Sequence, residues 1–195
     1  TGLKYCIVVA GGSGIRMGHE IPKQLIELNG KPILMWTLEK FYQFNTDMRI
    51  VVALPTDQQE FWKQLCSIHN FTIAHKVVNG GITRFHSVKN ALAEIGNEGF
   101  VAIHDGVRPL VSQSTIERCF AAVEEYGAVI PVISPSDSVR EVIDDISRAL
   151  NRSKLRLVQT PQVFHADLLQ QAYQQAYRPE FTDDASVVES LGKAI

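Results

Sequence analysis

The sequence is poor in cysteine, and its cysteines form no recognisable framework. Cys6, Cys66 and Cys119 are the only three in 195 residues, and none of them belongs to a C-x-x-C pair. Such widely spaced cysteines argue against a disulfide-stapled fold and favour a reducing compartment. Cys6 and Cys119 lie within apolar patterns, so we expect both to be buried as small hydrophobic side chains.

Long hydrophobic runs are also absent. No stretch reaches the roughly 20 apolar residues that a membrane-spanning helix needs. The first residues lack the charged lead and the cleavage pattern of a signal peptide. We therefore predict a cytoplasmic protein that has no membrane partner.

Neither sign of charge is in excess. Lys and Arg number 19 against 21 Asp and Glu, so the formal net charge is −2. This balance excludes a polybasic coat for nucleic acid, so no nucleic-acid partner is predicted, whereas a small anionic ligand in a local basic pocket is compatible with it. The content of 45% hydrophobic and 21% charged residues is ordinary for a globular chain, and the length predicts a single domain over residues 1–195.

What the sequence does contain is an alternation of short apolar runs with helical periods. The runs read as strands buried on both faces and cover residues 5–10, 49–53, 71–78, 100–104 and 128–132. Apolar residues recur with helical spacing within 88–95, 116–123 and 169–176, and Ser114 and Thr115 offer an N-cap to the second of these helices. This order predicts an α/β fold, in which a mostly parallel, twisted sheet carries helices on both faces. Ligands then bind beyond the carboxyl ends of the strands.

One stretch, at about 134–157, departs from this alternation. It contains Pro135, several charges and only short apolar pieces. An irregular excursion of this length in a compact domain is usually functional or disordered. We interpret it as an arm that protrudes from the domain, and a hairpin is one form that such an arm can take.

A glycine-rich loop follows the first predicted strand. Residues 11–18 contain four glycines and Arg16, and Lys23 comes shortly afterwards. Glycines allow backbone amides to approach a phosphate, and two cations beside them would neutralise a polyphosphate. The loop ends in neither the Gly-Lys-Ser/Thr of a P-loop nor the pattern of a dinucleotide fingerprint. A plain glycine-rich turn with solvated basic residues is the alternative.

Two further loops carry candidate chemistry. Gly80 and Gly81 precede a helix start with Arg84 and Ser87 in its first turns, which would offer backbone amides to an anion; a plain turn capped by Thr83 is the alternative. Asp105 follows the fourth predicted strand, where a carboxylate suits Mg²⁺, and Arg108 could hold a second anion. The alternative for Asp105 is a turn or capping residue.

Two segments near the C-terminal end are less informative. Residues 159–164 are interpreted as an extended segment before a helix, and residues 182–186 as a helix N-cap with a liganding role left open. The histidines show no metal-ligand spacing, and no Gly-x-Ser-x-Gly or Cys/His nucleophile pattern is present.

Taken in order, these motifs resemble those of the 2-C-methyl-D-erythritol 4-phosphate cytidylyltransferase family over nearly the whole chain. The resemblance is carried by Ala10-Gly11-Gly12-Ser13-Gly14-Ile15-Arg16-Met17, Pro22-Lys23-Gln24, Gly80-Gly81 with Arg84 and Ser87, His104-Asp105-Gly106-Val107-Arg108-Pro109, Gln159-Thr160-Pro161-Gln162 with Phe164, and Thr182-Asp183-Asp184-Ala185. It implies a Rossmann-like nucleotidyltransferase fold, a homodimer, Mg²⁺ as cofactor, and CTP and a polyol phosphate as substrates. The implied reaction joins CMP to methylerythritol phosphate and releases pyrophosphate.

The resemblance also implies roles for individual residues. Arg16, Lys23 and Arg152 would be catalytic, and Asp105 would hold Mg²⁺. Arg152 lies in the arm, which in this family crosses to the partner subunit and completes its site. The implied nucleotide-binding residues are Ala10, Gly11, Gly12, Gly14, Gly80, Gly81 and Ser87, and the implied acceptor-binding residues are Arg108, Asp137, Ser138 and Thr182.

The sequence departs from the family pattern at several positions. Ile82 stands where an acid is common, and Ser138 replaces a usual Thr. Family members also carry an acidic metal ligand and a lysine beyond position 195, so a complete site is expected to need residues outside the given sequence. Two alternatives stay open at this point. One is a ribitol-5-phosphate cytidylyltransferase, which shares most of these motifs, and the other is a non-catalytic nucleotide-binding module.

Overall fold

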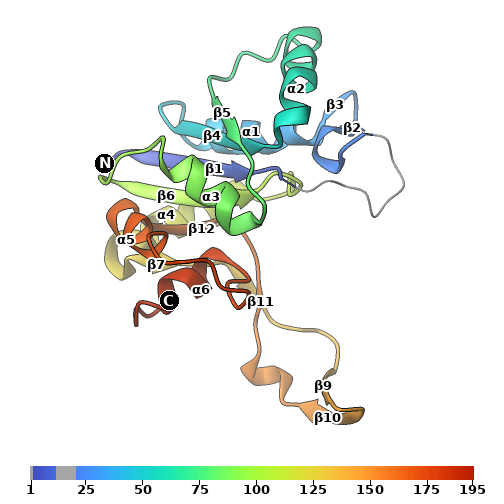
Figure 1. Cartoon of the computed structure of the whole chain (residues 1–195), viewed down its shortest axis with the longest axis vertical. Coiled ribbons are helices and arrows are strands. Elements are labelled where there is room, and N and C mark those ends of the chain that lie inside the picture. Colours follow the sequence, from blue (N-terminus) through green and yellow to red (C-terminus); the bar gives the residue numbers. More distant parts are fainter. Residues whose placement is uncertain (1, 12–20) are drawn as a thin grey trace.

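A central sheet organises the fold. The computed structural model describes residues 2–11 and 21–195. Its six-stranded sheet has the order β5-β4-β1-β6-β12-β7 (Figure 1). Parallel pairing joins β5, β4, β1 and β6, whereas β12 runs antiparallel to both β6 and β7. The strands are β1 (Lys4–Val9), β4 (Arg49–Leu54), β5 (Lys76–Asn79), β6 (Phe100–Asp105), β7 (Ala128–Val129) and β12 (Gln162–His165).

Helices cover both faces of this sheet, as predicted, because successive side chains of each strand point to opposite faces. Cys6 and Val8 of β1 belong to one hydrophobic cluster, and Tyr5 and Ile7 belong to the other. The first cluster is completed by α1 (Ile33–Phe44), α2 (Thr56–Ile68) and α4 (Gln113–Tyr126), and the second by α3 (Arg84–Leu92), α5 (Ala166–Ala172) and α6 (Asp184–Glu189).

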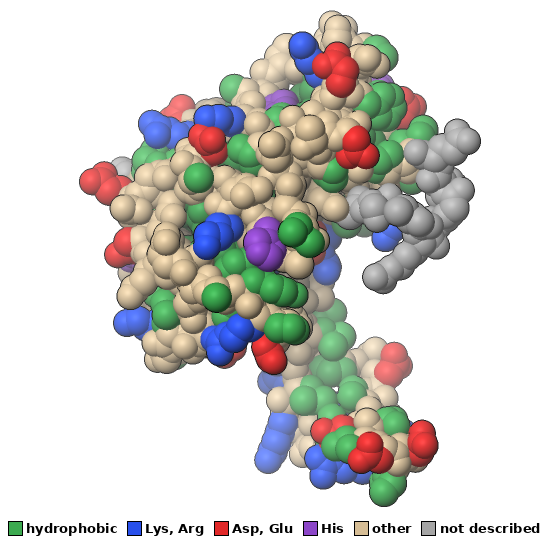
Figure 2. Space-filling view, viewed as in Figure 1, with side chains coloured by type: hydrophobic (Ala, Val, Ile, Leu, Met, Phe, Trp, Pro, Cys, Tyr) green, Lys and Arg blue, Asp and Glu red, His purple; other side chains and the backbone are tan. Residues whose placement is uncertain are grey.

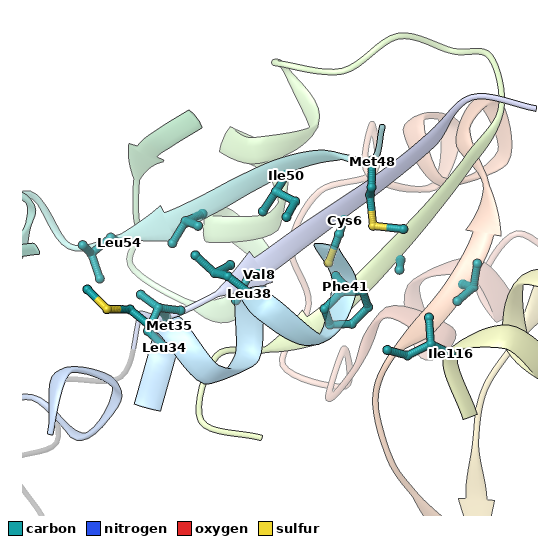
Figure 3. Close-up of a cluster of buried hydrophobic side chains, with 14 of the residues drawn as sticks. Cys6, Val8, Leu34, Met35, Leu38, Phe41, Met48, Ile50, Leu54 and Ile116 are labelled. Carbon is teal, nitrogen blue, oxygen red and sulfur yellow. The ribbon is translucent and has the colours of Figure 1, made fainter. Parts of the chain in front are cut away.

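In the first cluster, side chains of α1 pack against those of β1. Figure 3 shows Cys6 and Val8 of β1 beside Leu38 and Phe41 of α1. These four side chains are completely buried. Cys6 and Cys119 are both buried and all three cysteines are free, which confirms the interpretation of these thiols as small hydrophobic side chains.

The ends of two helices are set by local side-chain bonds. Thr83 caps α3 by accepting a hydrogen bond from the His86 amide. The cap of α4 is Ser112, whose hydroxyl accepts from the Thr115 amide; the expectation that Ser114 or Thr115 would form this cap was therefore wrong.

Two predicted strands are shorter than their apolar runs. The third begins only at Lys76, because Phe71 and His75 pack against Trp62 of α2 and the His75 ring bonds the Ile73 carbonyl instead of leaving it for a ladder. The fifth run divides into β7 and the separate strand β8 (Val132–Ile133), with Pro131 between them. Proline has no amide hydrogen and cannot continue a ladder.

The predicted arm is present and projects from the body of the domain (Figure 1). At its base β8 pairs antiparallel with β11 (Leu157–Val158). At its tip β9 (Val139–Ile143) and β10 (Ile146–Leu150) form a hairpin, closed by Asp144 and Asp145 with φ of 46° and 67°. Two central residues with positive φ give a turn that matches the twist of the strands. The 3-10 helix η3 (Arg152–Lys154) follows the hairpin.

Smaller elements complete the domain. The 3-10 helix η2 (Lys23–Leu25) precedes a short hairpin of β2 (Glu27–Leu28) and β3 (Lys31–Pro32). Within residues 2–11 and 21–195, no helix combines the length and the apolar character that crossing a membrane requires.

Gly99 is expected to be essential for the entry into β6. Its φ is +86°, and a Cβ there would lie 2.0 Å from the Leu3 carbonyl oxygen, which accepts a hydrogen bond from the Phe100 amide. Gly30 has a similar φ of +82° but nothing within 4 Å of a Cβ. We expect Gly30→Ala to lower the free energy of unfolding by roughly 1 kcal/mol, and Gly99→Ala by roughly 3 kcal/mol or more. Urea denaturation measures both, and equal losses would contradict the close approach of Leu3.

Candidate active site

The loops that follow four strands meet at one edge of the sheet. The Ala10 amide donates to the Ala53 carbonyl over 2.9 Å, and the Gly106 amide donates to the Val9 carbonyl over 2.8 Å. The Gly80 amide donates to the carbonyl that ends β4 over 3.0 Å. Gly11 at the start of the first glycine loop, the Gly80–Gly81 loop and the acidic loop therefore lie side by side at the carboxyl ends of β1, β4, β5 and β6.

Ser87 joins two of these loops. Its hydroxyl oxygen accepts a hydrogen bond from the Gly81 amide at 2.9 Å and donates to the Thr83 carbonyl at 3.2 Å. A Cβ on Gly11 would lie 3.4 Å from the same oxygen. Gly11 from one motif thus lies beside Gly81 and Ser87 from another, and the three form one continuous surface.

Gly81 can only be glycine in this position. A Cβ there would lie 2.4 Å from the His86 Cβ and 2.9 Å from the Ser87 nitrogen. The amides of Gly80 and Gly81 both donate inside the protein. The expectation that this pair exposes amides to an anion is therefore wrong, and the missing Cβ of Gly81 instead allows its backbone to pack against the start of α3.

Lys23 lies on η2, and its neighbour Gln24 ties that helix to the end of β1. The buried Gln24 amide donates to the Ala10 carbonyl and to Gln58 Oε1, both over 2.7 Å. Lys23 itself is exposed to solvent. Gln24 therefore fixes the segment that carries Lys23 against the predicted nucleotide-binding strand end.

Asp105 is the acidic centre of this edge. Its Oδ2 accepts from Arg108 Nε at 2.9 Å, and its Oδ1 lies 3.5 Å from Arg84 Nη2. Arg108 also donates to Gln159 Oε1 over 2.8 Å. The Asp105 side chain is 28% exposed, so solvent and small ligands reach it. The structure thus brings the two residues predicted for metal and acceptor binding into direct contact.

The buried side chain of His104 fixes the Asp105 loop through two hydrogen bonds. Its Nε2 bonds the Arg108 carbonyl and its Nδ1 bonds Thr160 Oγ1, both at 3.0 Å. Because a carbonyl only accepts, Nε2 carries the proton and the Thr160 hydroxyl donates to Nδ1. The Thr160 oxygen also accepts from the Asp105 amide at 3.2 Å. Burial lowers the pKa of His104 to about 4, so the ring is neutral in this network.

The segment that contains Thr182 adjoins this centre. Asp183 caps α6 by accepting from the Ser186 amide, which confirms the predicted N-cap, and it also accepts from Gln162 over 3.0 Å. The next residue, Asp184, lies 2.8 Å from Arg84. Thr182 is exposed and precedes these two acids. It therefore stands on the rim of the edge that Asp105 occupies.

Comparison with known proteins agrees with this arrangement. Residues 5–195 match the model of the 2-C-methyl-D-erythritol 4-phosphate cytidylyltransferase (IspD) family. A curated protein of that name from Bacteroides fragilis is 54% identical over 97% of this chain and 86% of its own length. Another from Bacteroides thetaiotaomicron is 51% identical over 95% of this chain and 85% of its own length.

The chain belongs to the 2-C-methyl-D-erythritol 4-phosphate cytidylyltransferase family. Its fold agrees with a solved structure of the Francisella tularensis protein of that name, with a TM-score of 0.80 and 34% identity over 98% of this chain and 87% of that one. The predicted α/β fold and the predicted family are both confirmed.

Not every residue implied by the cytidylyltransferase motifs lies at this edge. Gly12, Gly14 and Arg16 fall outside the described residues. Asp137 and Ser138 are exposed on the arm, and Arg152 donates to the Ser136 carbonyl there. The arm points away from the body (Figure 1), so these three do not contact the Asp105 centre of their own chain.

A cytidylyltransferase of this family is expected to use Mg²⁺, and the residues present can accommodate it. Mg²⁺ takes one or two carboxylates and completes its shell with water and phosphate oxygens. Asp105 supplies one partly exposed carboxylate at the correct edge. Within residues 2–11 and 21–195, no group of three His, Cys, Asp or Glu side chains could hold a metal ion. The donor set therefore fits a metal bound largely through a nucleotide.

Sequence reasoning missed the supporting residues of the site. Gln24, His104, Thr160 and Asp184 orient the edge without any recognisable ligand spacing. Their only signal is membership of the motifs that carry the family resemblance.

The depressed pKa of His104 gives the protein a testable acid sensitivity. The unfolded chain takes up a proton on this ring below pH about 6.5, whereas the folded chain does so only near pH 4. Stability from the neutral ring is therefore fully present above pH 6.5 and is lost as the pH falls towards 4. We expect His104→Gln to remove about 3 kcal/mol of the decrease in unfolding free energy between pH 7 and 4. Parallel pH profiles from urea denaturation would contradict this.

Proposed function

We propose that the protein transfers a cytidylyl group from CTP to 2-C-methyl-D-erythritol 4-phosphate and releases pyrophosphate. The observation that carries this is the convergence of the family motifs on one sheet edge. There the Gly11–Ser87 surface, Asp105 with Arg108, and the Thr182 segment adjoin one another. High identity to cytidylyltransferases over nearly the full chain supports the same reading.

The reaction needs no covalent enzyme intermediate. A phosphate oxygen of the acceptor attacks the α-phosphorus of CTP, a new P–O bond forms, and the P–O bond to pyrophosphate breaks. The protein therefore has to align two anions and lower the repulsion between them. In such phosphoryl-type transfers, positioning and charge stabilisation supply almost all of the catalysis.

The residues of the edge would share these tasks. Lys23, together with Arg16, would neutralise the triphosphate. The surface formed by Gly11, Gly81 and Ser87 would receive the cytosine ring. Arg108 would bind the acceptor phosphate through its guanidinium fork. The remaining implied contacts are with Ala10, Gly11, Gly12, Gly14, Gly80 and Thr182.

Asp105 would hold Mg²⁺ in this scheme. When bound, the metal neutralises phosphate oxygens and orients the triphosphate. Asp105 suits this role because its carboxylate is reachable while its backbone amide is fixed by Thr160. Arg108 contacts Asp105, so it would place the acceptor phosphate close to the metal that Asp105 would hold.

The experiment is a pyrophosphate-release assay on the protein with CTP and Mg²⁺. We expect methylerythritol phosphate to be used with a kcat/KM at least about 100-fold above that of ribitol 5-phosphate, because a site built for one set of hydroxyls leaves groups unpaired with another. CTP should exceed ATP and GTP by a similar factor, because a site that pairs the hydrogen-bonding groups of cytosine leaves groups unpaired with a purine.

A Lys23→Ala protein prepared in the same way guards against a contaminating enzyme, since it should lose most of the activity while keeping its fold. A preference for ribitol 5-phosphate would show that the proposed acceptor is wrong and that ribitol 5-phosphate is the acceptor. Binding of CTP without turnover of either acceptor would favour a nucleotide-binding module instead.

We further propose that the protein is a homodimer in which the arm crosses to the partner. Exposed apolar side chains on the arm support this, among them Val142, Ile143 and Ile146 at 57–73% exposure. Figure 2 shows hydrophobic side chains among charged ones on the arm surface. An open cavity of about 710 Å³ between α4 and the base of the arm is lined by further apolar residues, including Leu110 at 88% exposure. Exposed apolar surface of this kind marks an interaction site.

Arg152 would then complete the site of the partner subunit, with Asp137 and Ser138 beside it. Lys23→Ala and Arg152→Ala homodimers should each be nearly inactive. After joint unfolding and refolding, about half of the dimers are mixed and each mixed dimer has one intact site, so about a quarter of wild-type activity should return. Activity that fails to return, with mixed dimers confirmed by native mass spectrometry, would show that Arg152 serves its own chain.

We also propose a cytoplasmic location. The three cysteines are free, and two of them are buried among apolar side chains. Reduced, unpaired cysteines are typical of a reducing compartment. The free cysteines are the observation that supports this assignment.

A further inference from the structure

A completely buried carboxylate lies directly behind the candidate site. Asp184, the first residue of α6, has no exposed side-chain surface. Its Oδ1 accepts from the hydroxyl of the buried Tyr173 at 2.6 Å. Burial and the adjoining charge of Asp184 raise the pKa of Tyr173, so this hydroxyl keeps its proton and remains a donor. A buried charge is costly unless it is paired, so the identity of its partner matters.

Arg84 is that partner, and it is shared between two acids. Its Nη2 lies 2.8 Å from Asp184 Oδ2 but 3.5 Å from Asp105 Oδ1. The closer contact has the distance of an ion pair without the geometry of a hydrogen bond, and Oδ2 accepts no hydrogen bond from the described residues. Burial alone would lower the pKa of Arg84, but the charge of Asp184, followed by that of Asp105, raises it above its usual value. The guanidinium is therefore permanently charged.

We propose that Asp184, held by Tyr173, draws Arg84 back from Asp105 so that Asp105 stays available to a divalent cation. Asp184 is then a positioning residue, which acts on Asp105 by holding Arg84. The inference rests on the proposed function, because it takes Asp105 as the carboxylate that holds Mg²⁺. It adds a reason for the otherwise expensive burial of Asp184.

Competition between cations for the Asp105 oxygens explains why the position of Arg84 matters. A cation at hydrogen-bond distance from Asp105 competes with Mg²⁺ for the same oxygens, and the competition weakens as the distance grows. Arg108 already occupies Oδ2 of Asp105, although it is 44% exposed and can move aside. Arg84 is less exposed, at 30%, and its position depends on Asp184. Without that acid, Arg84 could move from 3.5 Å to hydrogen-bond distance of Oδ1, and arginines would then hold both oxygens of Asp105.

A merely structural ion pair between α3 and α6 makes different predictions. Its loss would lower stability, and it would leave the response to Mg²⁺ unchanged. A positioning role instead predicts effects of opposite sign. Asp184→Asn should release Arg84 towards Asp105 and weaken metal binding, whereas adding Arg84→Gln to it should remove the competing charge and restore metal binding.

The experiment is calorimetric titration of CTP into the full chain at a series of Mg²⁺ concentrations, with no acceptor present. We expect Asp184→Asn to raise the Mg²⁺ concentration for half-maximal CTP affinity by roughly tenfold, and the Arg84→Gln/Asp184→Asn double variant to return within about threefold of wild type. Arg84→Gln alone should leave this concentration unchanged or lower. Glu39→Gln, which breaks the Lys31–Glu39 ion pair away from the site, is the matched control and should not shift it.

The Asp105→Asn variant distinguishes a failure of the positioning role from a failure of the proposed metal site. If Asp105→Asn shifts the Mg²⁺ response but Asp184→Asn does not, or if the double variant stays as weak as Asp184→Asn, the positioning role is overturned and the proposed function stands. If Asp105→Asn itself has no effect, both the metal assignment and this role fall. Should Asp184→Asn not fold, Arg84→Gln decides, since a higher Mg²⁺ requirement in that variant would overturn the role.

Discussion

The carboxylate of Asp105 sits between two arginines at the end of a central parallel strand, and much of the surrounding architecture acts to keep it there. One arginine is exposed and can move aside, while the other is anchored to a buried acid. A carboxylate held on both sides in this way keeps a defined direction. The position of β6 beside β1 puts that charge next to the end of β1, where Val9 pairs with Asp105.

Hydrogen bonds from distant segments fix this carboxylate. His104 and Thr160 tie the backbone on either side of Asp105 to the segment before β12. Gln162, in β12, reaches both Asp183 and the Ala185 amide at the start of α6. The motif around residues 159–164 thus connects the β6 loop with the loop that carries Thr182. A preorganised arrangement of this kind is what transfer between two anions requires.

The sequence was sufficient for the sheet, the arm and most of the motif positions, because these depend on local patterns. Continuous apolar runs predict buried parallel strands wherever nothing interrupts them, as in β1, β4 and β6. The prediction was wrong where tertiary contacts override the pattern, as at Phe71, which packs on Trp62 instead of joining the sheet. The cap of α4 was misplaced because Ser112, Ser114 and Thr115 are equally suited to capping by composition alone.

The site was predictable as a set of loops but not as a network. The sequence pattern marks Gly81 as part of a loop that could contact a ligand. It does not reveal that the Gly81 amide donates to the Ser87 hydroxyl. Asp184 was predicted only as part of an N-cap, because the approach of Arg84 and Tyr173 depends on how α3, α5 and α6 pack. Pairing across such distances is set by the fold and leaves no spacing in the sequence.

The most direct measurement is a crystal structure of the protein with CTP and Mg²⁺. The account predicts cytosine against Gly81 and Ser87, the triphosphate along the loop after β1, and the metal on Asp105 with Arg84 still paired to Asp184. CTP bound instead in the apolar cavity between α4 and the arm, or a metal that does not contact Asp105, would contradict it.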